Sequence, residues 1–113
     1  MNLFGKLFDS EKNSSPQQAV LIHIDATDLP DEFWQLQERL YEVVERSGAG
    51  EFDGNEIGEG TATLFAYGPD ASRLWRVMEP ILRKYPMCDG ARVVLRSGGP
   101  GSPENELQLR VTQ

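Results

Sequence analysis

The segment from Gly50 to Asp70, GEFDGNEIGEGTATLFAYGPD, constrains the fold more than any other part of the chain. A run rich in the strand formers Thr, Leu, Phe and Tyr follows a glycine-rich turn signal, and an acidic run of similar length precedes it. We therefore expect a hairpin with its turn at Gly58–Gly60. Asp53–Gly54 is the alternative position for a tight turn, or else the position of a β-bulge. Helical patterns lie on both sides of this hairpin.

The first helical pattern covers Asp31–Ser47, where apolar residues recur at steps of three and four, as in a helix that buries one side. Gly48 supplies the C-terminal stop. Trp34 and Tyr41, seven residues apart, are expected to widen the buried stripe. The stripe itself is formed by Phe33, Leu36, Leu40, Val43 and Val44.

The second helical pattern begins at Ala71, after the start signals Pro69 and Asp70, and its apolar spacing continues to Tyr85. Pro80 lies inside the pattern and should kink the helix near its middle, because proline removes a backbone hydrogen bond.

Three further strands are predicted at Ala19–Asp25, Ala91–Ser97 and Glu106–Thr112. The order strand, helix, strand, strand, helix, strand is the split βαβ pattern, and right-handed crossovers put both helices on one face. We predict an α+β fold: a ferredoxin-like βαββαβ sandwich, with two helices on one face of an antiparallel sheet and an extra C-terminal strand. The expected strand order is 4-1-3-2, with the fifth strand beside the fourth. The fifth strand should turn three residues to the core: Leu107, Leu109 and Val111.

A chain of 113 residues predicts one domain, which we place at residues 19–113 after a flexible leader at residues 1–18. The leader lacks the apolar core of a signal peptide, and no apolar run is long enough for a membrane span. The single cysteine, Cys88, excludes an internal disulfide. A reducing, cytoplasmic location is the simplest expectation.

Strand alternation divides the sheet residues between a face under the helices and an open face. The open face should carry aromatic, basic and apolar side chains together. As a partner or ligand face we predict His23, Phe65, Tyr67, Arg92, Val94 and Arg96.

The second strand carries an acidic edge, which we predict from Glu51, Asp53, Glu56 and Glu59. Charge at a sheet edge blocks pairing with other chains, so these acids have a structural explanation. Alternation puts Glu51 and Asp53 on one face and Glu56 on the other. With 18 acidic against 11 basic residues the net charge is −7, which argues against nucleic-acid binding and suits a basic partner.

Four short motifs, GEFDGNEIGEG, LFAYGPDASRLW, EPILR and RSGGPG, resemble a group of small bacterial ferredoxin-like domains. That group shares an acidic hairpin with the pattern GE-aromatic-DG-x-E, a YGPDA helix start and a later Gly-Pro-Gly loop. The resemblance covers roughly Ala19 to Val111. It implies the fold, and it transfers no catalytic residue because the group has no assigned activity.

No set of nucleophile, base and orienting group can be assembled from one histidine and one cysteine, so we predict no enzyme, no metal and no cofactor. A Cys88–His23 pair lacks a third group, and the residues after Asp53 match only part of a calcium loop. A hydrolase with a pair of carboxylates from Glu51, Asp53 and Glu56 is not expected either, because all three lie on a sheet edge without a cleft to raise a pKa.

Two functions remain. The first is a non-catalytic protein-interaction or self-association module, a homodimer or the acidic partner of a basic protein, as an antidote or immunity protein would be. The alternative is a small domain that binds an anionic ligand for regulation on the open face, with Arg92, Arg96 and His23 around the anion and Tyr67 beside it.

Overall fold

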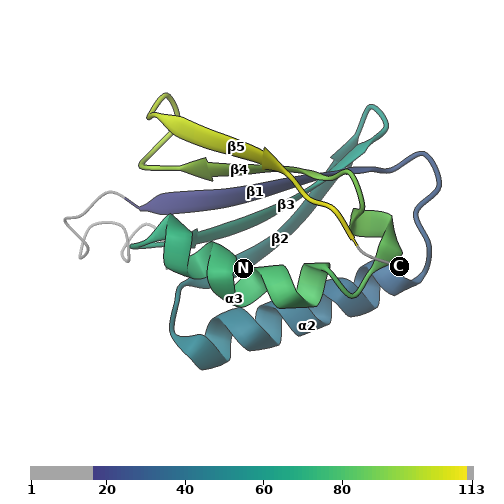
Figure 1. The fold of residues 1–113 in the computed structure, drawn as a ribbon, viewed down its shortest axis with the longest axis horizontal. Helices are drawn as coiled ribbons and strands as arrows, with labels where there is room; N and C mark the ends of the chain where they lie inside the picture. The colour runs from purple at the N-terminus through teal and green to yellow at the C-terminus, as the bar shows by residue number, and fades with distance from the viewer. Residues whose placement is uncertain (1–16, 112–113) are drawn as a thin grey trace.

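The computed structural model describes residues 17–111 (Figure 1). Of the predicted leader, only residues 17 and 18 fall within that range, and Gln18 already belongs to the first strand. The elements follow in the order β1 (Gln18–Asp25), α2 (Glu32–Ser47), β2 (Glu51–Gly58), β3 (Thr61–Gly68), α3 (Ala71–Leu82), the short 3-10 helix η1 (Pro86–Cys88), β4 (Arg92–Arg96) and β5 (Glu104–Gln108).

The five strands form one antiparallel sheet in the order β2-β3-β1-β4-β5. Both helices pack on the same face of this sheet, with α2 against β2 and α3 against β1, β3 and β4 (Figure 1). The predicted α+β class, strand order and two-layer arrangement are confirmed. This topology is compatible with a ferredoxin-like fold carrying one extra edge strand.

The hairpin between the helices turns at Glu59–Gly60, as preferred from the sequence. Both turn residues have positive φ, 53° and 79°, as a two-residue type I′ hairpin turn requires. The second signal, at Asp53–Gly54, is also real. The pairing of β2 with β3 shifts by one residue between Phe52 and Gly54, so a β-bulge interrupts the edge strand.

The core lies between the sheet and one stripe of each helix. On α2 that stripe is Phe33, Leu36, Leu40 and Val44, as predicted. The expectation for Trp34 and Tyr41 was wrong, since they remain 58% and 52% exposed. Each directly follows a buried residue, and one residue turns a helix by about 100°, which carries the side chain away from the core.

The second helix ends at Leu82, three residues earlier than predicted, so Pro80 lies in its last turn instead of near its middle. Tyr85 is buried, but it reaches the core from the loop after α3. Asp70 caps the other end of the helix, where its Oδ1 accepts hydrogen bonds from the backbone N–H groups of Ser72 and Arg73 at 3.0 and 3.2 Å.

The last strand begins two residues earlier than predicted and ends at Gln108. All five of its residues are exposed, and Leu107, expected in the core, is 38% exposed. The helices cover the four other strands and leave β5 beyond their edge (Figure 1). Leu109 is fully buried, and its backbone N–H donates to the Ala91 carbonyl over 2.8 Å.

Candidate functional site: the open face of the sheet

The sheet face opposite the helices, here called the open face, has an apolar row at its centre. Register pairing places Leu21 of β1 directly between Phe65 of β3 and Val94 of β4. Val94 is only 3% exposed and Ala19, one row along, is fully buried, although α2 and α3 pack on the other face of the sheet. The half-buried Leu21 and Phe65 and the buried Val94 thus form a continuous apolar row across three adjacent strands.

Polar side chains border this apolar row on one side. His23 shares a hydrogen bond of 3.0 Å between its Nδ1 and the Thr63 Oγ1. Partial burial lowers the pKa of His23 below its ordinary value of 6.5, and the Arg92 charge lowers it further. The imidazole is therefore neutral at neutral pH and adds no positive charge to the face.

The two predicted arginines of β4 already have partners. Arg92 forms an ion pair with Glu106 of β5, with 2.7 Å between Nη1 and Oε2. The Arg96 Nε donates to the Gly98 carbonyl over 2.8 Å, which draws its side chain toward the loop before β5. An anion on the open face would compete with both contacts, so this arrangement does not favour the ligand-binding alternative at this place.

The bulge in β2 corrects the placement of the acidic edge. Glu51 pairs with Tyr67, and after the one-residue shift Glu56 pairs with Thr63. Because paired residues of an antiparallel sheet point to the same side, Glu51 and Glu56 both lie on the open face, contrary to the expectation that they point opposite ways. Asp53 is the extra residue of the bulge.

A second acidic row lies at the other edge of the open face. Glu104 pairs with Arg96, and Glu106 pairs with Val94, so both acids of β5 share that face. The sequence analysis missed Glu104 because it began the last strand at Glu106, and it did not assign Glu106 to this face. The open face is thus an apolar centre with a basic strand beside it and carboxylates along both edges.

Cys88 is separated from the open face by the sheet. It is fully buried in the core on the helix side, and burial raises its pKa from 9.0 to about 12. His23 lies on the other face, so the two residues form no catalytic pair. Within residues 17–111, no group of three or more His, Cys, Asp or Glu side chains is placed to hold a metal ion.

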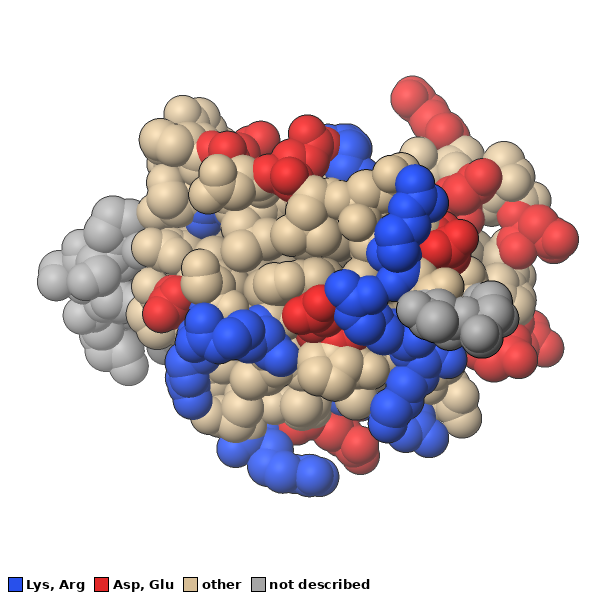
Figure 2. Space-filling view, viewed as in Figure 1, with Lys and Arg blue, Asp and Glu red and all other residues tan. Residues whose placement is uncertain are grey.

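The charges are unevenly spread over the surface. Figure 2 shows acidic side chains gathered at the end that holds the β2–β3 turn and the loop before α2, and basic side chains along α3 and the chain after it. At this end, the Ala26 N–H in the loop before α2 donates a hydrogen bond of 2.8 Å to the Gly60 carbonyl in the β2–β3 turn. The exposed acids of this end are Asp25, Asp28, Asp31, Glu32, Glu56 and Glu59.

Over the described range, neither helix has the length and apolar character needed to cross a membrane. Comparison of the chain with protein-family models, with curated proteins and with solved structures finds no match.

Proposed function

We propose that this chain is a non-catalytic protein-interaction module that holds a basic partner protein on its open sheet face. The observation that carries the proposal is the row Leu21, Phe65 and Val94 between two acidic edges. An apolar centre inside a polar, charged rim is the anatomy of protein–protein interfaces. The fold itself, proposed as ferredoxin-like, serves as the scaffold for this face.

The rim decides between a basic partner and a second copy of this chain. Two sheets that pack face to face about a two-fold axis along the strands lay β2 over β5. An axis across the strands lays β2 over β2. In both cases Glu51 and Glu56 meet carboxylates of the other copy, and like charges opposite each other disfavour the complex. A partner with lysines and arginines around an apolar centre meets no such repulsion.

The same charge pattern supports the role of an acidic antidote or immunity-type partner, which neutralises a basic protein by covering its surface. His23, hydrogen-bonded to Thr63 and neutral, and the deeply buried Cys88 leave no nucleophile–base pair, which supports a non-catalytic role. The single free thiol suits the reducing cytoplasm that we propose as its location.

The test combines solution mass with capture of the partner. Light scattering on the full chain at two concentrations should give the monomer mass of 12.7 kDa. Immobilised chain should then retain a basic protein from the cell extract, and retention should fall as salt rises, since salt screens rim charges. Phe65→Asp and Glu51→Lys should each abolish retention.

Tyr41→Asp is the matched control, because Tyr41 is an exposed aromatic residue on α2, away from the open face. It should leave retention unchanged. A stable dimer that Phe65→Asp converts to monomer would show that a second copy occupies the face, and the basic-partner proposal would be wrong. If Phe65→Asp unfolds the protein, Phe65 packs too tightly to be a contact residue, and retention by Glu51→Lys then decides the proposal.

A further inference from the structure

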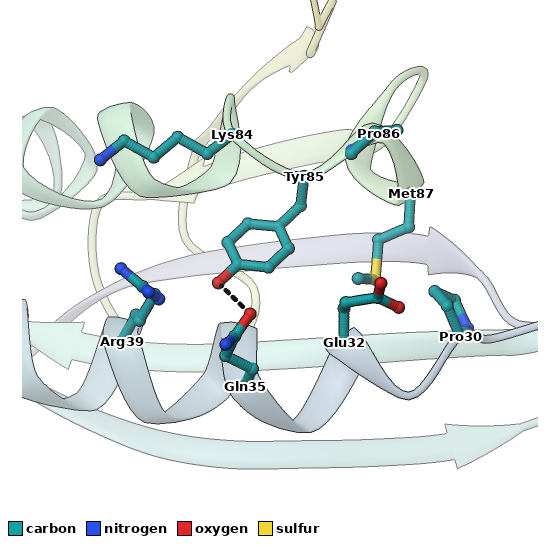
Figure 3. A pocket seen from close by; sticks show the side chains of 8 residues that line it. All are labelled: Pro30, Glu32, Gln35, Arg39, Lys84, Tyr85, Pro86 and Met87. Atoms are coloured by element: carbon teal, nitrogen blue, oxygen red, sulfur yellow. Dashed lines mark hydrogen bonds between the residues drawn. The ribbon is translucent and has the colours of Figure 1, made fainter.

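A pocket of about 510 Å³ lies on the helix side of the molecule, between α2 and the loop that follows α3. One wall is a single row along α2, formed by Glu32, Gln35 and Arg39 at steps of three and four (Figure 3). The opposite wall is the continuous segment 84–87. The Tyr85 hydroxyl donates a hydrogen bond of 3.1 Å to the Gln35 Oε1 and joins the two walls.

The two ends of this pocket differ in chemistry. Figure 3 shows Arg39 and Lys84, one from each wall, at the same end, with the Tyr85 ring in the middle. Met87 and the Glu32 carboxylate lie toward the other end, beside Pro30. A small molecule in this pocket would therefore meet two cations first, then apolar surface, and finally a carboxylate.

Most other described cations are already engaged. The guanidinium groups of five arginines donate to carbonyl or side-chain oxygens of the protein: Arg73, Arg83, Arg92, Arg96 and Arg110. Within residues 17–111, four cations have no hydrogen-bond or ion-pair partner for their charged groups: Arg39, Arg46, Arg76 and Lys84. Of these four, Arg39 and Lys84 line the pocket. Two like charges from separate elements at one pocket end repel each other until an anion lies between them.

We propose that this pocket binds a small organic anion with one acid group and a flat apolar body. The carboxylate accepts hydrogen bonds from Arg39 and Lys84, and the body lies against the Tyr85 ring and the Met87 thioether, a sulfur that packs well on aromatic groups. Glu32, seven residues before Arg39 and so about 10 Å away along α2, excludes a second acid group at the far end. This site is independent of the open face.

The experiment is a titration of the full ¹⁵N-labelled chain with 2-naphthoate, followed by amide chemical shifts. We expect saturable shifts confined to Gln35, Arg39 and residues 84–87. The neutral 2-naphthylmethanol, with the same rings, should bind at least about tenfold more weakly because it lacks the charge for the two cations. Naphthalene-2,6-dicarboxylate should bind more weakly than 2-naphthoate, because its second acid meets Glu32.

Paired variants locate the site. Arg39→Gln/Lys84→Gln should raise the Kd for 2-naphthoate at least about tenfold. Arg46→Gln/Arg76→Gln removes the same amount of charge from α2 and α3 outside the pocket and should leave the Kd within twofold. All four side chains are exposed, so both variants should fold.

Three results would overturn the proposal. They are shifts that cluster on the open face, equal weakening by both double variants, and no saturable shift with 5 mM 2-naphthoate. None of these results bears on the solution mass or on partner capture, so the two proposals fail separately.

Discussion

Burial of the Cys88 thiol should make the fold sensitive to alkaline pH. Its pKa is raised from 9.0 to about 12 in the folded chain. The unfolded chain therefore releases this proton first as pH rises, so the thiol's contribution to stability is fully present below pH 9. It is then lost progressively as pH rises toward 12.

The size of the effect follows from proton linkage. At pH 10 an unfolded thiol is about nine-tenths ionised, while the buried one remains protonated. This difference lowers the free energy of unfolding by about 1.4 kcal/mol relative to pH 8, at 1.36 kcal/mol per pKa unit. With a urea m-value of about 1–3 kcal/mol/M, the midpoint should fall by roughly 0.5–1.4 M.

Urea unfolding at pH 8 and pH 10, with a reductant present, measures this loss. Cys88→Ala is the control, because it keeps every other titrating group and removes only the thiol. The variant should be less stable at both pH values, since it leaves a cavity, but its midpoint should move less between them. Equal pH dependence in the two proteins would refute the reasoning and place the thiol in contact with water.

Other substitutions test the backbone and the edge. Gly68→Ala would put a Cβ 2.4 Å from the Ala49 carbonyl oxygen and should cost about 1–3 kcal/mol in thermal unfolding, whereas Gly58→Ala, with open space around it, should cost far less. Asp70→Ala removes the α3 cap and should cost about 1 kcal/mol, which a loss of helix signal at lower temperature would reveal. Replacing Glu51 and Asp53 together with serine should cost about 1 kcal/mol or less, and a larger loss in urea would mean that they hold a buried network.

Much of the fold follows from local patterns in the chain. Apolar spacing located both helices, and Gly48 at φ 71° ends α2 as its sequence signal indicated. The strand order followed from element order and the handedness of crossovers. Boundaries were less predictable where side chains do not decide them. The alternation at the C-terminus continues past Gln108, and the backbone of Leu109 still bonds to Gly90 and Ala91, but the regular ladder ends at Gln108.

The open face was predictable in its centre and not in its rim. Phe65 and Val94 were placed correctly by alternation. The positions of Glu51 and Glu56 depended on a bulge that the Asp53–Gly54 signal allowed but did not require. A one-residue shift reverses the side on which every later side chain of a strand points.

The helix-side pocket was not foreseen because two distant segments form it. Arg39 and Gln35 read as the solvent side of α2, and Lys84 and Tyr85 as the end of α3. Their proximity depends on where α3 stops and on the path of the loop after it. The three-residue error in the end of that helix was enough to hide the site.

The exposed strand β5 has a consequence for how this molecule opens. It pairs only with β4, lies outside the cover of the helices, and is tied down just beyond its end by Leu109. Segments with few buried contacts open locally at low free energy while the rest of a protein stays folded. Amide hydrogens of Glu104–Gln108 should therefore exchange with solvent fastest among the strands. Each such opening uncovers the edge of β4, whose free backbone groups could pair with a strand of another chain.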